Sequence, residues 1–366
     1  MRSPLLFVSG EYPPDVGGVG DYTDRLRRAL SVFEGRQSSL LSRGRVRRWD
    51  VRALAWLLRT APREGIVHIQ FQAGAFDLLG DVCLMPILLR RLRPGVRVVT
   101  TFHDTRVPYL FPKAGRLRRA AVKLLAATSH AVIAADERDL AWLDGLSRHR
   151  HLVPIGPNVV CEPGPGYDRA AFRRALGLDE TTLAMVYFGL LNHSKGLNLL
   201  VETFELVLRQ VPKARLLLLG GETGASDPTD RHTAARVRAS LAGLGELTLR
   251  TGWLQPQALS RYLLAGDIAV LPYADGASPR RGSLLACAEH GLPIVSTQPA
   301  SQAVASAVHA VPPNAPSLAA AVLEVAHDAA LSQALRTSAA ALAARTSWSH
   351  IAAAHANIYQ QLRTSL

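Results

Sequence analysis

Two adjacent arginines, Arg280 and Arg281, stand where the sequence predicts the start of a helix. The helix is expected from about Gly282 to His290, after the loop Asp275 to Pro279, and Gly291 ends it. Two cations at this end oppose the helix dipole, whereas free backbone amides and forked guanidinium groups bind phosphate. The pair therefore predicts a phosphate or diphosphate site. A solvated charge pair at a helix start is the alternative.

A glycine-rich segment follows the first predicted strand, Leu5 to Ser9. Gly17, Gly18 and Gly20 lead into a helix expected to begin near Asp21 or Tyr22. Such a turn lets the backbone approach a ligand closely and offers free amides to an anion. The spacing is not GxGxxG, which disfavours dinucleotide binding. A tight loop without a ligand is the other interpretation.

Two further polar positions follow predicted strands. His103 and Asp104 come directly after the strand Val96 to Thr101, and open α/β sheets bind ligands at the carboxyl ends of their strands. A loop histidine bonded to the backbone is the alternative. Lys195 follows the strand Leu183 to Gly189 and its loop, and it opens a helix, which is a suitable place for a phosphate-binding lysine. The Walker pattern GxxxxGK[ST] is absent.

The elements that must position these residues alternate as strand and helix, which predicts parallel sheets covered by helices on both faces. A stretch rich in proline and glycine, Gly156 to Gly166, divides two such runs and is the predicted linker. The other expected helices are Arg43 to Arg63, Asp81 to Leu92, Arg116 to Thr128, the alanine-rich stretch Ala303 to Thr346, and Trp348 to Leu362.

Composition sets outer limits on fold and function. The 366 residues are 48% hydrophobic and 19% charged, which indicates a globular protein of two domains. The three cysteines are far apart, so neither a disulfide framework nor a structural zinc site is expected. We expect no signal peptide, because the N-terminal apolar run has four residues, and no membrane-spanning helix, because no apolar run reaches 18 residues.

The positive charge is concentrated in the N-terminal half. Residues 1–158 hold 25 Lys and Arg against 14 Asp and Glu, a net charge of +11, and residues 159–366 hold 17 against 15, a net charge of +2. An anionic partner is therefore expected at the N-terminal half. The basic helix Arg116 to Thr128 favours an anionic membrane surface, with a solvated face as the alternative. Nucleic acid is disfavoured because no base-stacking aromatic set is present.

At this point the sequence resembles the family 4 (group 1) retaining glycosyltransferases of GT-B architecture. The resemblance covers nearly the whole chain, and the motifs follow one another in the family's order. They are GGVGDYT (Gly17 to Thr23), TFHDT (Thr101 to Thr105), FGLLNHSKG (Phe188 to Gly196), TGWLQPQALSRYLLAGDIAVLPY (Thr251 to Tyr273), HGLPIVST (His290 to Thr297) and the terminal WSHIAAAHANIYQQL.

The resemblance implies two Rossmann-like, doubly wound parallel-sheet domains that face each other across a cleft. Residues 1–160 would bind the acceptor and residues 161–346 the nucleotide-sugar donor, while the terminal helix, 347–366, would pack back on the first domain. The implied reaction is hexosyl transfer with retention, without a metal or a cofactor besides the donor. A glycan or lipid-linked acceptor is implied. Together with the cysteine usage and the basic N-terminal half, this predicts a cytoplasmic protein, with a peripheral position on the inner face of the plasma membrane as an option.

The resemblance also implies roles for single residues. Lys195 would contact the donor diphosphate, Gly17 and Gly18 would lie beside its phosphates, and His103 would lie near the transferring sugar. The remaining implied donor-binding positions are Asn192, Gly221, Trp253, Leu254, Ser283 and Leu284. The implied acceptor-binding positions are Asp15, Tyr22 and Asp104.

The chain departs from the family at two glutamates, which fall at Ser278 and Ala286, and at an arginine, which falls at Leu190. We infer that Arg280 or Arg281 replaces the lost cation on the diphosphate, because charge on the leaving group must be stabilised without a metal. Two further replacements are expected: Glu289, one helical turn beyond Ala286, for the ribose, and Asp275 for sugar hydroxyls. A sugar-nucleotide-binding protein with impaired catalysis and a sugar-nucleotide epimerase of the same architecture are the alternatives.

Overall fold

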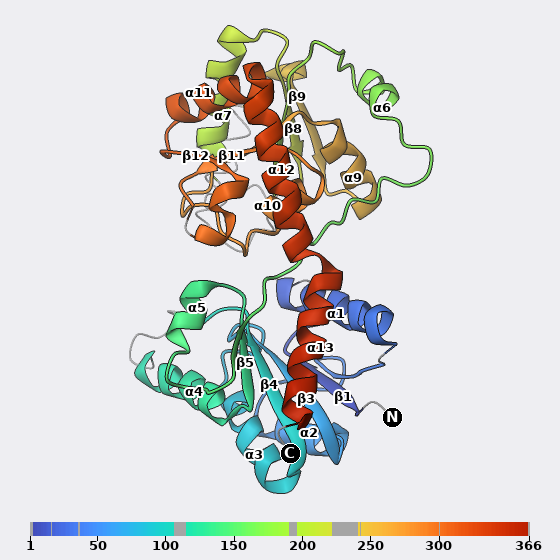
Figure 1. The fold of residues 1–366 in the computed structure, drawn as a ribbon, viewed down its shortest axis with the longest axis vertical. Helices are drawn as coiled ribbons and strands as arrows, with labels where there is room; N and C mark the ends of the chain where they lie inside the picture. The colour runs from blue at the N-terminus through green and yellow to red at the C-terminus, as the bar shows by residue number, and fades with distance from the viewer. Residues whose placement is uncertain are drawn as a thin grey trace. The chain divides into compact units, whose positions relative to one another are not determined.

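The computed structural model describes residues 3–15, 17–35, 37–105, 115–189, 196–221, 241, 243–299 and 301–364. The chain forms two compact units (Figure 1): unit 1 is Met1–Gly156 with Ser347–Leu366, and unit 2 is Pro157–Thr346. The division therefore falls at the start of the stretch rich in proline and glycine, near the expected boundary at residue 160. Each unit contains one six-stranded parallel sheet with helices, which confirms the predicted α/β fold class of GT-B type.

The sheet of unit 1 has the strand order β2-β1-β3-β4-β5-β6. Its strands are β1 (Leu5–Ser9), β2 (Ser39–Leu41), β3 (Glu64–Phe71), β4 (Gly95–Phe102), β5 (Ala131–Ala134) and β6 (Arg150–Leu152). Its helices are α1 (Gly18–Glu34), α2 (Val51–Thr60), the 3-10 helix η1 (Asp81–Leu84), α3 (Met85–Leu92), α4 (Gly115–Thr128), α5 (Glu137–Trp142) and α13 (Trp348–Thr364). The strand order changes direction between β1 and β3.

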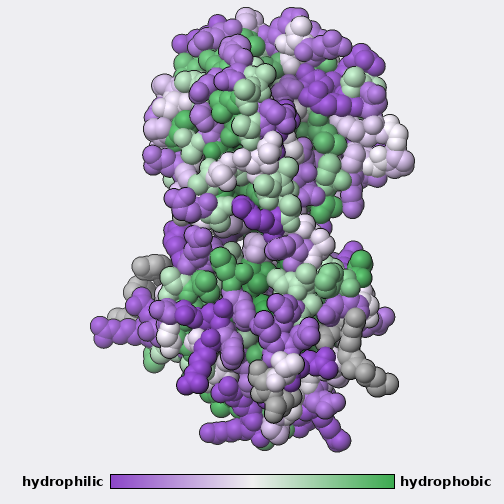
Figure 2. Space-filling model, in the orientation of Figure 1, coloured by the Kyte–Doolittle hydropathy of each residue, from purple (hydrophilic) through white to green (hydrophobic). Residues whose placement is uncertain are grey.

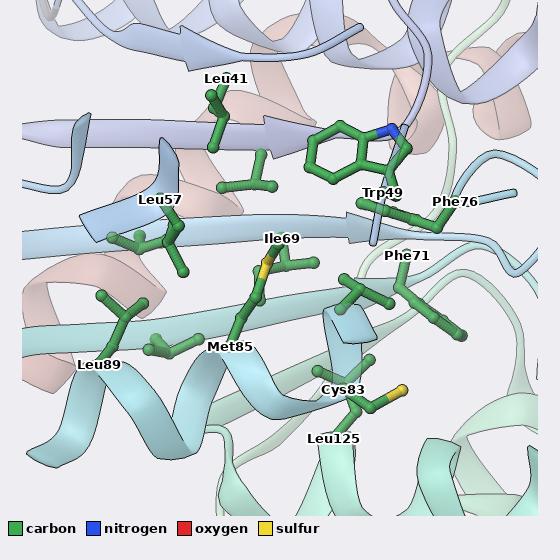
Figure 3. Packing of buried hydrophobic residues seen from close by; sticks show 14 of the residues in the cluster. Leu41, Trp49, Leu57, Ile69, Phe71, Phe76, Cys83, Met85, Leu89 and Leu125 are labelled. Atoms are coloured by element: carbon green, nitrogen blue, oxygen red, sulfur yellow. The ribbon is translucent and has the colours of Figure 1, made fainter. Parts of the chain in front are cut away.

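Alternating side chains of the strands build a separate core on each face of this sheet. Leu5 and Phe7 of β1 pack with helices α1 and α13, whereas Leu6 and Val8 belong to the cluster beneath α2, α3 and α4. Figure 3 shows part of the second cluster, where the buried ring of Trp49 meets Phe76 edge to face. Since the terminal helix α13 covers one face, residues from both ends of the chain complete one core.

The sheet of unit 2 has the order β12-β11-β10-β7-β8-β9 and changes direction between β10 and β7. Its strands are β7 (Ala184–Phe188), β8 (Arg215–Leu219), β9 (Thr248–Gly252), β10 (Ile268–Leu271), β11 (Ile294–Thr297) and β12 (His309–Val311). Its described helices are α6 (Arg169–Ala175), α7 (Leu197–Gln210), the 3-10 helix η4 (Gly245–Leu247), α9 (Pro256–Ala265), α10 (Gly282–Glu289), the 3-10 helix η5 (Gln302–Ala307), α11 (Ala315–His327) and α12 (Ala329–Thr346).

The prediction of one long basic helix over Arg43 to Arg63 is wrong. Only α2 is helical there, because Trp49 is buried with its indole N–H donating to the carbonyl of Gly10 at 3.0 Å, and Asp50 caps the helix. The helix expected over Asp81 to Leu92 divides into η1 and α3.

Short strands and helix starts account for the other differences. Helix α1 begins at Gly18, ahead of the expected start near Asp21. The stretch from Ala303, expected to be helical, includes the short strand β12. Strands as short as β2 and β12 carry too few residues for a two-residue period to be recognised.

Figure 2 shows hydrophilic residues over much of the viewed face of each unit. Among the described residues no single helix is long and apolar enough to cross a membrane. One bent pair, Ala315–His327 with Ala329–Thr364 at 101°, meets the length and composition criteria together. Its residues Leu318, Val322 and Ile351 are fully buried.

Candidate functional site

Each unit has a point where its strand order reverses, and in open α/β sheets ligands bind outside the carboxyl ends of the strands at such a point. In unit 1 this point lies between β1 and β3, next to the segments after Ser9 and Phe71. In unit 2 it lies between β7 and β10, next to Gly189 and the segment that leads into α10. Most of the expected site residues therefore lie at the carboxyl ends of the strands, at or near these two reversal points.

Arg281 is the residue immediately before α10, at the reversal point of unit 2. Its guanidinium forms an ion pair with the carboxylate of Asp275 and lies 4.7 Å over the ring of Tyr273. The arginine side chain is only 15% exposed, whereas that of Asp275 is 62% exposed. The cation is thus held in place by an aromatic ring and is not simply a solvated surface charge. An incoming anion would compete with an exposed carboxylate for it.

Hydroxyl groups lie beside this arginine. The hydroxyls of Tyr273 and Ser283 are hydrogen-bonded at 2.7 Å, and burial raises the pKa of the Tyr273 phenol. Gly189, which follows β7, has a φ of +152°, and a Cβ there would lie 3.9 Å from the hydroxyl oxygen of Ser283. The backbone after β7 therefore comes close to the groups after β10. These hydroxyls stay protonated at neutral pH and can donate to phosphate oxygens.

Other expected donor-binding residues lie at the neighbouring strand ends. Gly221 follows β8 and Trp253 follows β9, and a Cβ on Gly221 would lie 3.8 Å from that of Trp253. The indole of Trp253 is 71% exposed, so its ring face can stack on a planar group. Leu254 is half-buried, and Leu284 is fully buried, so Leu284 reaches a ligand only through its backbone.

Two expected residues, Lys195 and Asn192, lie outside the described residues. Gly196, which precedes α7, has a φ of +70°, and a Cβ there would lie 1.8 Å from the carbonyl oxygen of Pro272. Only glycine fits this contact. The start of α7 is therefore packed directly against the segment that follows β10.

Glu289 is the last residue of α10, whereas Arg281 precedes the first. Seven residues of helix correspond to about 10 Å along the axis. The carboxylate of Glu289 accepts a hydrogen bond from the backbone N–H of Cys161, and burial raises its pKa. The structure therefore places Glu289 at the opposite end of the helix from Arg281 and Ser283. Ala286 is fully buried.

In unit 1, a residue missed by the sequence analysis occupies the start of α1. Glu11 accepts hydrogen bonds from the backbone N–H groups of Val19, at 3.0 Å, and Gly20, at 3.4 Å. A Cβ on Gly17 would lie 2.1 Å from the same carboxylate, whereas one on Gly18 would meet open space. Two of the amides at this helix start are therefore already satisfied by a protein carboxylate. The sequence feature that could have indicated this contact is an acidic residue, Glu11, shortly before a predicted helix start.

His103 is joined to the core of unit 1 by a directed chain of hydrogen bonds that begins at His68. His68 is fully buried, and its Nε2 lies 2.8 Å from the hydroxyl of Thr101 and 3.2 Å from the amide nitrogen of Gln70. An amide nitrogen can only donate, so this Nε2 accepts and Nδ1 carries the proton. That proton is donated to the hydroxyl of Tyr359, 2.7 Å away in α13.

The same amide determines the proton position on His103. With its nitrogen turned to His68, Gln70 presents its oxygen to Nε2 of His103 at 2.8 Å. This oxygen can only accept, so Nε2 of His103 carries a proton and donates it. The backbone N–H of His103 donates to the carbonyl of Phe71 at 2.9 Å. The imidazole is thus held by a side-chain acceptor, in addition to the backbone contact that the alternative interpretation assumed.

The expected acceptor-binding residues have different surroundings. Tyr22 is only 5% exposed, and its ring contacts that of His103 edge to face with centroids 4.8 Å apart. Burial raises the pKa of this phenol. Asp104 is half-buried and adjoins His103, whereas Asp15 is exposed in the turn before α1, where its N–H donates to the carbonyl of Tyr12 at 3.0 Å. Tyr22 therefore packs against a site residue, and Asp15 is open to solvent.

Within the described ranges no group of three or more His, Cys, Asp and Glu side chains is arranged to hold a metal ion. The three cysteines are unpaired, and burial raises the pKa of the Cys83 and Cys287 thiols to about 12. These two thiols are therefore protonated and poor nucleophiles at neutral pH.

Comparison with known proteins gives one family match and many similar folds. Residues 182–328 match the family model described as Glycosyl transferases group 1. The sequence has no significant match among curated proteins. Sucrose-phosphate synthase from Thermosynechococcus elongatus has a similar structure, with a TM-score of 0.71, 19% identity and full coverage of both chains.

Two other solved structures are similar over almost the same length. HepE from Anabaena in complex with UDP and glucose has a TM-score of 0.70 and 15% identity over 98% of this chain and 100% of its own. The E. coli trehalose-6-phosphate protein bound with UDP-2-fluoro glucose has a TM-score of 0.67 and 14% identity over 98% of this chain and 99% of its own. At these identities the structural likeness establishes the fold.

Proposed function

From the group 1 glycosyltransferase domain that residues 182–328 form, we propose that this protein transfers a sugar from a nucleotide-sugar donor to an acceptor. The family match is the observation that carries the proposal. It spans the strands β7 to β12, and Gly189, Trp253, Tyr273 and Arg281 follow the carboxyl ends of three of them. We propose further that the sugar is a hexose, that its anomeric configuration is retained, and that no metal takes part.

Unit 2 would hold the donor. Arg281 and Lys195 would stabilise the negative charge that develops on the departing diphosphate. The hydroxyl of Ser283 would donate to a phosphate oxygen, and the exposed ring of Trp253 would lie against the base. The ion pair between Arg281 and Asp275 suggests that donor binding displaces this carboxylate from the guanidinium, which leaves it available for sugar hydroxyls.

Unit 1 would hold the acceptor and His103. The imidazole, oriented by Gln70, would contact the transferring sugar, with Asp104 and the exposed Asp15 on the acceptor side. We propose a glycan or lipid-linked acceptor, and an anionic or membrane-bound one agrees with the net charge of +11 on residues 1–158. Because Glu289 lies at the far end of α10, we no longer propose it as the ribose ligand.

Acceptor-dependent release of nucleotide tests the proposed reaction. A thermal-shift panel of nucleotide sugars, with UDP-glucose first because two of the similar structures contain UDP, identifies the donor. A transferase releases nucleoside diphosphate when acceptor is added and forms a product whose anomeric configuration is read by NMR. Release of nucleotide with formation of an epimerised free sugar would instead identify an epimerase. Stable binding without turnover would identify a binding protein.

Arg281→Gln tests the proposed diphosphate contact. We expect donor affinity to fall about 10- to 100-fold, because a hydrogen bond to a charged group contributes about 1.5–3 kcal/mol. Calorimetric titration with the donor measures this loss, and Arg209→Gln, an exposed arginine at the end of α7, is the control. Equal donor affinity in wild type and Arg281→Gln would contradict the assignment.

A peripheral membrane position is proposed for the same protein in the cytoplasm. Helix α4 exposes Leu117 and Leu124 among basic residues, and α2 exposes Trp56 with the Arg59 guanidinium 5.8 Å over its ring. Apolar and basic side chains together on a helix surface suit the interface of an anionic membrane. Salt-sensitive sedimentation with anionic vesicles would support this position, and no sedimentation at low salt would contradict it.

A further inference from the structure

A cavity of about 800 Å³ opens at the amino-terminal edge of the sheet in unit 1. It lies where β4, β5 and β6 begin, and Arg90 of α3, Leu362 of α13 and the segment before β6 also line it. His103 follows the opposite end of β4, six residues after Arg97. Six residues of strand span about 20 Å. The cavity is therefore separate from the candidate site at the carboxyl edge.

The walls of this cavity are strongly cationic. Arg90, Arg97, Arg148 and Arg150 line it together with two histidines, and Asp144 is the single acidic residue among the lining residues. Asp144 is already paired with Arg150. The Arg97 guanidinium donates to the carbonyl of Pro94, at 3.3 Å.

Two of these arginines have no side-chain acceptor among the described residues. Within the part of the chain that the structure describes, Arg90 and Arg148 make no side-chain hydrogen bond or ion pair. Gathering like charges without counter-charges is unfavourable, and an anionic ligand removes that cost.

His130 adds a donor of fixed direction at the inner wall. The backbone N–H of Val98 donates to its Nδ1 at 2.9 Å, so the proton of the neutral ring is on Nε2. Burial, and then the electrostatic effects of Arg90, Arg97 and the neighbouring His149, lower the pKa of His130 to about 4. Two arginines of the cavity thus act on one half-buried imidazole.

We propose that this cavity binds the phosphate group of a small phosphorylated molecule or of a lipid headgroup. Planar guanidinium groups match phosphate oxygens with paired hydrogen bonds, and the Nε2–H of His130 supplies another donor. The volume is in the range of small-molecule sites and is much larger than phosphate alone requires, so the ligand carries a further group. A small phosphorylated molecule and a lipid headgroup would both present the same phosphate oxygens to these arginines. The proposal does not depend on the identity of the sugar donor.

The test follows the imidazole of His130 by NMR in the full-length protein, with its signal assigned from His130→Gln. An anion beside the ring raises the pKa of the imidazole. Inorganic phosphate and glycerol 3-phosphate test a free ligand, and phosphatidylcholine vesicles with and without phosphatidic acid test a headgroup. We expect the pKa to rise by one unit or more with at least one probe, and Arg97→Gln/Arg148→Gln to weaken that binding at least tenfold.

The control is Arg209→Gln/Arg250→Gln, which removes the same charge from exposed positions in unit 2. A response to the soluble phosphates identifies a free ligand. Binding that appears only with phosphatidic acid, read by co-sedimentation and lost in the cavity variant but not in the control, identifies a lipid headgroup. The proposal is overturned if no probe changes the His130 titration or the vesicle binding, or if the cavity and control variants weaken binding equally.

Discussion

Glu11 and Gly17 show how two residues together determine the start of a helix. Gly17 has a φ of −178°, which any residue can adopt, so backbone strain does not require glycine there. Glycine is required because of the Glu11 carboxylate. This carboxylate accepts hydrogen bonds from the N–H groups of Val19 and Gly20, and it fills the space that a side chain at residue 17 would occupy. The glycine is thus explained by a protein carboxylate, where the sequence had suggested a ligand.

Gly17→Ala is expected to destabilise unit 1 by about 1–3 kcal/mol, the usual cost of overpacking. Glu11→Ala alone removes the cap and costs about 1 kcal/mol. In the Glu11→Ala background Gly17→Ala should cost clearly less, because the clashing group is gone. Urea unfolding of the two single variants and the double variant measures this coupling, and Gly18→Ala, which faces open space, serves as the control. Strictly additive effects would contradict the explanation.

At the scale of elements, α13 connects the end of the chain to His103. The hydroxyl of Tyr359 accepts a hydrogen bond from Nδ1–H of His68. Gln70 donates to Nε2 of His68 and accepts from Nε2–H of His103, so one chain of hydrogen bonds links α13, β3 and His103. A helix at the C-terminus thereby takes part in fixing the tautomer of a candidate catalytic imidazole. This contact joins residues 291 positions apart, and no local pattern indicates it.

Gln70→Leu is expected to lower kcat tenfold or more with little change in KM, because the imidazole loses the acceptor that orients it. Gln70→Glu keeps an acceptor and adds a negative charge, which should raise the pKa of His103 and move the acidic limb of the pH–rate profile to higher pH. Steady-state kinetics across pH measure both effects. An unchanged kcat in Gln70→Leu would show that the relay does not serve the reaction.

At the scale of the whole molecule, buried histidines make stability depend on pH. His68 and His355 are fully buried, and burial lowers both pKa values, that of His355 to about 4. Between pH about 6.5 and 4 the unfolded chain binds protons that the folded chain does not. The free energy of unfolding therefore falls as the pH falls through this window.

His355→Leu should weaken this pH dependence by up to about 1.4 kcal/mol per pH unit, the value of one proton fully bound only in the unfolded state. Urea unfolding followed at several pH values between 6.5 and 4 measures the slope. The control is His350→Gln, an exposed position on the same helix. The same slope in wild type and His355→Leu would refute the contribution of this residue.

The sequence correctly predicted those elements that are determined by neighbouring residues. The strand Leu5 to Ser9, the turn at Gly291 and the helix after Arg281 follow from apolar runs and end signals that a few neighbouring residues carry. It failed where a distant contact overrides a local pattern. The indole of Trp49, which bonds to Gly10, ends the helix expected from Arg43 to Arg63.

The sequence alone thus determined two α/β units, their glycosyltransferase-like motifs and the basic bias of the N-terminal half, because periodicity, composition and motif order are properties of the chain itself. The surroundings of Arg281 and Glu289 were decided by the tertiary structure. So were the capping of α1 by Glu11, the orientation of His103 by α13 and the cationic cavity around His130. Each of these depends on which segments the strand order brings together, and that pairing is set by burial over the whole unit.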